Sequence, residues 1–231
     1  MAADWLVAVA WVALAVAFAC AAAIAYDVYG RGYRQRMKVM EIVWPVTALY
    51  AGPSANLAYE RFGKPKSHRW MVERGRDEPP DKPWWATVSV GVSHCGAGCT
   101  LGDIIAEAAV FLLALSIAGQ TLFAEYVGDY VLAVGLGLAF QYFAIAPRRG
   151  LGFRKGIAAA AKADILSLTA FEVGLFGWMA LTSLVFFPAP HHLQADSPVY
   201  WFMMQIGMCL GFLTAYPVNA WLIRRGIKEA M

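Results

Sequence analysis

The sequence predicts an all-α fold, a polytopic transmembrane helical bundle of six to seven spans that forms a single integral membrane domain over residues 1–231. Hydrophobic residues make up 60% of the chain and charged residues 15%, whereas a soluble domain carries about 25% charged residues. The charges are also gathered between long apolar runs, which is the pattern of membrane helices. The lipid bilayer is therefore the expected partner, and no motif in the sequence predicts binding of nucleic acid.

The first two apolar runs are expected to enter the membrane in different ways. Residues 5–26 lack the basic start of a signal peptide and exceed the length of its apolar part, so we expect a retained membrane anchor. The second run, 39–59, contains Pro45 and the pair Gly52-Pro53. Because proline and glycine interrupt helices, this run is expected to kink or to turn back as a re-entrant segment.

The middle of the chain contains one long loop and one long apolar stretch. Residues 60–82 form a polar, proline-rich extramembrane loop, and residues 84–123 are then almost uninterruptedly apolar. A single helix of that length would measure about 60 Å, twice the thickness of the hydrocarbon core. We therefore expect it to tilt, to project from the bilayer or to break, and the glycine-rich segment 96–102 is the place for a break.

The second half of the chain contains three further apolar runs, 130–146, 165–187 and 199–223. Glu125 and Asp129 form a short acidic tip before the first of these runs. A basic, alanine-rich segment, 147–162, is expected to lie on the membrane surface or to extend the next span.

The distribution of basic residues predicts the orientation. Lysine and arginine gather at the cytoplasmic ends of membrane spans. In this chain they gather at 31–38, 148–155 and 224–228, which predicts a cytoplasmic carboxy terminus. The tips at 125–129 and 188–198 should then lie outside.

Two arrangements satisfy this orientation. Seven crossings result if 39–59 spans the bilayer and 84–123 crosses it twice, but the basic loop 60–82 then lies outside. Six crossings result if 39–59 is re-entrant and the loop stays inside. Of the two arrangements we favour seven crossings.

The densest group of metal-ligating residues is His94, Cys95 and Cys99, within the long apolar stretch. Imidazole and thiol groups are ligands that copper(I), zinc and iron prefer. On a helix Cys95 and Cys99 share a face, which Asp103 and Glu107 continue at the same four-residue spacing. This face predicts a metal site or the lining of a cation path. In the alternative interpretation, the nearby glycines serve close helix packing and the cysteines are small buried residues.

Two glutamates, Glu107 and Glu172, lie deep within apolar runs, where an unpaired carboxylate is energetically unfavourable. We expect them to relay protons or cations, or to form a structural pair with a basic residue. Glu172 should face the interior of the bundle, close to the cysteine segment. Lys162 and Asp164 lie nearer the end of their run and are expected to be ordinary boundary charges.

Softer candidate metal ligands occur in the last span, where Met204 and Met208 share a helix face. Thioethers suit copper(I), although a methionine stripe also serves adaptable packing. His191 and His192, at an outer tip, are candidates for metal capture or are simply solvated. Cys20 has no other ligand near it in sequence, so we expect it to take no part in a metal site.

Four segments resemble those of one membrane protein family: Trp44–Tyr50, Ser93–Asp103, Tyr200–Met204 and Tyr216–Asn219. They are similar to an uncharacterised bacterial family, domain of unknown function 4396, from about Trp44 to the carboxy terminus. The resemblance implies an integral protein of a bacterial or archaeal inner membrane and implies little about activity. It also favours copper among the soft metals, because relatives are expected near copper-handling genes.

Three functions are consistent with these observations. The chain could bind copper(I) for transport or buffering, with His94, Cys95 and Cys99 as primary ligands. It could instead be a membrane oxidoreductase that uses the cysteine pair or a redox metal, or a structural or assembly subunit without chemistry. No Walker or dinucleotide-binding motif is present, so ATP-driven transport by this chain alone is not expected. The sequence leaves open the metal, the direction of transport and whether the chain forms a homo-oligomer.

Overall fold

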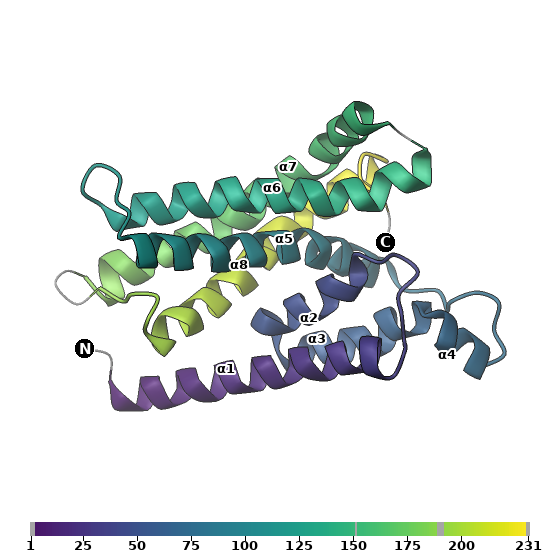
Figure 1. The fold of residues 1–231 in the computed structure, drawn as a ribbon, viewed down its shortest axis with the longest axis horizontal. Helices are drawn as coiled ribbons and strands as arrows, with labels where there is room; N and C mark the ends of the chain where they lie inside the picture. Colours follow the sequence, from purple (N-terminus) through teal and green to yellow (C-terminus); the bar gives the residue numbers. More distant parts are fainter. Residues whose placement is uncertain (1–2, 151, 189–191, 230–231) are drawn as a thin grey trace.

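The computed structural model describes residues 3–150, 152–188 and 192–229, and for 145–149 it describes only the backbone. The described chain is all-α, as predicted, and its long helices lie along one axis (Figure 1). The helices are α1 (Asp4–Ala25), α2 (Met40–Ala51), α3 (Pro53–Ala58), α4 (His68–Glu73), α5 (Trp84–Leu113), α6 (Thr121–Arg149), α7 (Phe153–Leu181) and α8 (Pro198–Arg224). Turns of π-helix extend three of them, over Tyr26–Gly30, Tyr59–Gly63 and Thr182–Phe186.

Within the described residues, five helices are long and apolar enough to cross a membrane: α1, α5, α6, α7 and α8. The protein is therefore a multi-pass membrane protein. Six to seven spans were expected, and the difference arises at the glycine-rich part of α5 and at the run 39–59.

The first difference is that α5 is continuous over its 30 residues, so the expected break at 96–102 does not occur. Its glycines allow α6 to approach closely instead. A Cβ atom on Gly98 would lie 2.9 Å from the Cα atom of Gly137, and a Cβ atom on Gly102 would lie 2.5 Å from the backbone nitrogen of Ala133. Real Cβ atoms do not come this close, so these positions need glycine. The packing interpretation of the glycines is confirmed, and the apolar stretch after the loop forms one long helix and the start of the next.

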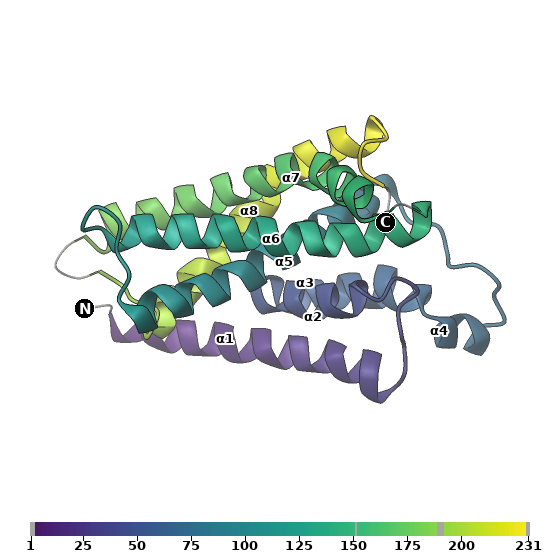
Figure 2. The ribbon, with the colours of Figure 1, turned by 45° about the horizontal axis from the view of Figure 1, so that its top comes forward.

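The second difference is that the run 39–59 turns back at Gly52, which has a φ of 53°, and α3 then begins at Pro53. The 12-residue helix α2 is about 18 Å long and is too short for the roughly 30 Å hydrocarbon core. The ring centroids of Trp44 and Tyr59 are 5.8 Å apart, whereas a straight helix would separate these residues by about 22 Å. Figures 1 and 2 both show α3 running back beside α2. The run therefore folds as a helical hairpin, whereas the arrangement with seven crossings needs it to span the bilayer.

The two ends of the bundle differ in the charge of the segments that they carry. The basic end carries the α1–α2 and α6–α7 connections, the segment between α3 and α5, and the carboxy-terminal turn (Figures 1 and 2). The acidic end carries the amino terminus and the α5–α6 and α7–α8 connections. The polar loop 60–82 thus lies on the same side as the other basic segments. Because α7 begins at Phe153, the basic segment before the next span extends that helix.

Candidate functional site

The central helix of the bundle, α5, holds the predicted stripe of thiols and carboxyl groups. It packs against α2, α6, α7 and α8, and it is the most buried of the five long helices. Cys95, Cys99 and Asp103 are fully buried, and Glu107 is 2% exposed. Their four-residue spacing places them along one side of α5, so the stripe faces the interior rather than lipid.

Four carboxyl groups gather on this side, because Asp103 and Glu107 are joined by Asp129 of α6 and Glu172 of α7. Each is an electrostatic neighbour of at least one other member of the group. No Lys or Arg side chain among the described residues forms an ion pair with any of them. Both carboxyl oxygens of Asp103 and of Glu172 lack a hydrogen-bond partner. Four buried acids cannot all be charged in an apolar interior, so the cluster must hold protons.

A hollow of about 460 Å³ at the acidic end reaches this cluster. Glu107 of α5 and Glu125 of α6 both line it, together with residues of the α5–α6 and α7–α8 connections such as Gln194. Carboxylates that line a hollow concentrate cations there. The hollow therefore joins the acidic end of the protein to the buried carboxyl cluster through Glu107.

The thiol pair lies next along α5, towards the basic end. Cys99 has Cys95, Glu172 and Asp103 as its electrostatic neighbours, so thiols and carboxyl groups form one continuous group. Both cysteines are free thiols. The hairpin also reaches this point. The phenol oxygen of Tyr50 would lie 3.2 Å from a Cβ atom on Gly96, the residue after Cys95, and it has no hydrogen-bond partner.

A buried ion pair closes the group at the basic end. The chain turns at Gly226, with a φ of +66°, and brings the Lys228 ammonium within 2.9 Å of Asp164 on α7. Ser167 lies 3.5 Å from the same ammonium and accepts a hydrogen bond from Asn219. Burial, the largest single cause, lowers the pKa of Lys228, but the attraction and hydrogen bond of Asp164, together with the influence of Cys95 and Cys99, raise that pKa above its ordinary value. Cys95 and Cys99 are thus electrostatic neighbours of the Lys228–Asp164 ion pair.

These electrostatic neighbours form one series of buried or half-buried groups, which we call the polar file: Glu125, Glu107, Asp129, Asp103, Glu172, Cys99, Cys95, Lys228 and Asp164. It runs from the hollow at the acidic end to the ion pair at the basic end. A family model described as domain of unknown function (DUF4396) matches residues 84–228.

The chain belongs to the DUF4396 family.

The match covers α5 to α8 and ends at Lys228, so it contains the whole polar file of this DUF4396 protein. The segment Trp44–Tyr50, which also carried the resemblance, lies outside the matched region. No curated protein and no solved structure matches the chain.

The other predicted metal ligands of the DUF4396 protein are His94, Met204 and Met208. The two methionines belong to the same buried cluster as Cys95 and Cys99, and the Met208 sulfur accepts a hydrogen bond from Thr100, at 3.7 Å. The ring of His94 packs at 6.3 Å from that of Phe140, and its electrostatic neighbours are Asp164 and Lys228 rather than the cysteines. Met204 and Met208 also line an apolar pocket between α1, α5 and α8. Among the described residues, no three or more His, Cys, Asp or Glu side chains are arranged so that together they could hold a metal ion.

The polar file includes three residues whose burial was not predicted. Asp129 was assigned to an acidic tip, but α6 begins eight residues earlier and buries it. Asp164 was expected to be a boundary charge and is fully buried, while Lys228 was counted only as part of a basic cluster. Lys162 is exposed and Glu172 is buried beside Cys99, as expected. His192 is exposed, and His191 lies outside the described residues.

Proposed function

We propose that this membrane protein conducts a soft metal cation, copper(I), along the polar file. The observation that carries the proposal is the group of four buried carboxyl groups without a basic partner, placed directly beside a thiol pair. A cation that enters the hollow at the acidic end is attracted first by Glu107 and Glu125. Asp129, Asp103 and Glu172 then lead to Cys99 and Cys95, which supply the soft ligands.

The two thiols form the proposed ligand set, because soft thiolate ligands favour copper(I). Each thiol must release its proton to bind the metal. The adjacent carboxyl groups of Glu172 and Asp103 are placed to receive these protons, so the cation enters as protons leave. His94 and the methionines take no part in this ligand set.

Copper(I) uptake into vesicles that contain the purified protein tests the proposal. Glu172→Gln keeps the size of the side chain and removes its charge, so we expect the rate of uptake to fall by about tenfold or more, the factor that 1.4 kcal/mol of lost stabilisation brings. Glu78→Gln, in the exposed loop, is the matched control and should leave the rate unchanged. Equal rates for the two variants would contradict the role of the carboxyl cluster.

The proposed orientation places the basic end in the cytoplasm of a bacterial or archaeal cell, with five crossings and the hairpin entering from that side. A cysteine introduced at Gln194 should then react with an impermeant thiol reagent in intact cells, because this residue is exposed at the acidic end. A cysteine at Glu78, in the loop at the basic end, should react only after lysis. The opposite result would invert the topology, and reaction of both in intact cells would place the loop outside.

A further inference from the structure

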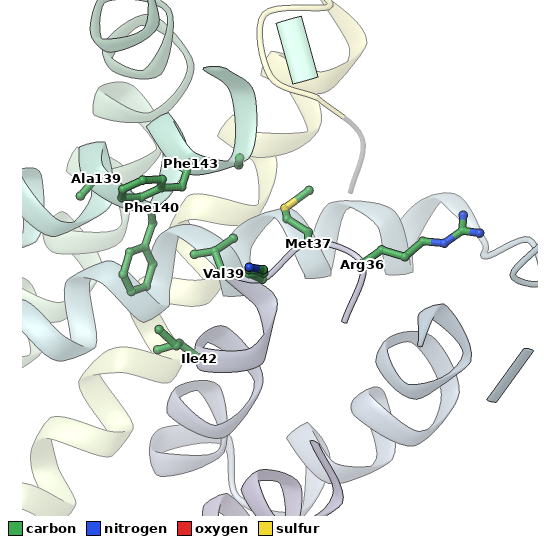
Figure 3. A pocket seen from close by; sticks show the side chains of 9 residues that line it. Arg36, Met37, Val39, Ile42, Ala139, Phe140 and Phe143 are labelled. Atoms are coloured by element: carbon green, nitrogen blue, oxygen red, sulfur yellow. The ribbon is translucent and has the colours of Figure 1, made fainter. Parts of the chain in front are cut away.

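A second hollow, unconnected with the polar file, lies at the basic end between the start of α2 and the last turns of α6. Its volume is about 580 Å³, within the range of pockets that hold small molecules. Figure 3 shows Val39 and Ile42 on one side and Phe140 and Phe143 on the other. We call this the α2–α6 pocket.

The walls of the α2–α6 pocket are apolar and open towards lipid. Ile42 is 44% exposed and Phe143 is 65% exposed, although both belong to membrane-embedded elements. The hairpin α2 starts at the basic end and runs inward, so the pocket follows it from the membrane surface towards the membrane interior. Such a slot suits a hydrocarbon chain that lies parallel to the helices.

The rim of the pocket is basic, and it lies at the basic end of the bundle. Arg36 and Lys38 are both exposed there, and Figure 3 shows Arg36 extending away from the apolar walls. In the same connection Arg31 forms an ion pair with Asp27, at 2.8 Å, and Arg34 forms one with Glu41, at 2.9 Å.

Neither Arg36 nor Lys38 has an acidic partner among the described residues. The two unpaired cations thus lie beside an apolar slot, the arrangement that a lipid headgroup with its acyl chain would require.

We propose that the α2–α6 pocket binds an anionic phospholipid, whose phosphate is held by Arg36 and Lys38 and whose acyl chain lies against Ile42 and Phe140. The charge of the rim selects the anionic headgroup, because basic pockets between membrane helices attract such lipids. The apolar slot selects a lipid over a free phosphate compound. The bound lipid would brace the open side of the helical hairpin, whose tip carries Tyr50.

Native mass spectrometry of the purified protein tests this site by measuring the affinity for the first bound lipid. Phosphatidylglycerol should bind more tightly than phosphatidylcholine with the same acyl chains. Arg36→Ala with Lys38→Ala should weaken phosphatidylglycerol binding by about thirtyfold, from about 1 kcal/mol per basic residue, and leave phosphatidylcholine binding unchanged. Ala139→Phe, which fills the slot and keeps both charges, should weaken binding of both lipids.

Two matched controls accompany these variants. Arg224→Ala with Arg225→Ala removes the same charge from exposed positions at the basic end, and Val131→Phe adds the same bulk on the lipid-facing side of α6. Both controls should bind phosphatidylglycerol as the wild type does.

Three results would overturn the proposal. The first is equal affinity for the two lipids, and the second is an equal loss of phosphatidylglycerol binding in the Arg36/Lys38 variant and the Arg224/Arg225 variant. The third is displacement of phosphatidylglycerol by excess glycerol phosphate, which would show a site for the free anion.

Discussion

Replacing Cys95 and Cys99 together with serine is expected to remove most of the copper(I) that the purified protein retains. Both thiols are fully buried and lie side by side along α5, with Glu172 and Asp103 next to them. Serine keeps the size of the side chain but offers a hard oxygen that copper(I) does not favour. The measurement is copper per protein after reconstitution with copper(I) under reducing conditions, and the wild type should lose copper as the pH falls because protons compete for the thiolates.

Cys20→Ser is the control for this experiment. Cys20 is half-buried on α1 and is no neighbour of the polar file. Its replacement should leave the copper content unchanged, and all variants should elute as the wild type does in size-exclusion chromatography. If the double variant retains as much copper as the wild type, the thiols are not the ligands and their small size in the packed interior is the better explanation.

Replacing Lys228 with methionine is expected to lower the free energy of unfolding by about 3–5 kcal/mol, because it leaves the buried Asp164 carboxylate without its partner. Lys155→Met removes the same charge from an exposed position of α7 and should change stability by less than about 0.5 kcal/mol. Resistance to unfolding in detergent, followed by circular dichroism, measures the difference.

The second substitution Asp164→Asn gives a sharper test. Combined with Lys228→Met, it removes the uncompensated charge, so most of the lost stability should return. A double variant as unstable as Lys228→Met alone would show that the lysine acts through packing and not through the ion pair. If Lys228→Met and Lys155→Met change the free energy of unfolding equally, the buried ion pair does not stabilise the basic end of the polar file.

The buried face of α5 could be predicted from the sequence because it depends on spacing within one helix. Cys95, Cys99, Asp103 and Glu107 follow one another at four residues, and any helix places such residues along one side. The depth of Glu172 in its apolar run likewise predicted an interior position. The glycines of α5 were ambiguous, since a break and close packing both use glycine. Gly137 and Ala133 on α6 decided between the two.

The sequence by itself determined the all-α membrane fold, the basic and acidic segments and the stripe on α5, because composition and helical periodicity are local properties. Only the tertiary structure decided that the run 39–59 turns back, since Trp44 meets Tyr59 through a bend that proline and glycine allow but do not require. It also decided that Asp164 pairs with Lys228, 64 residues away. A carboxylate and an ammonium near the ends of apolar runs could equally well remain hydrated at the membrane surface. They are buried here because the turn after α8 brings each within hydrogen-bonding distance of the other, which offsets the loss of their hydration.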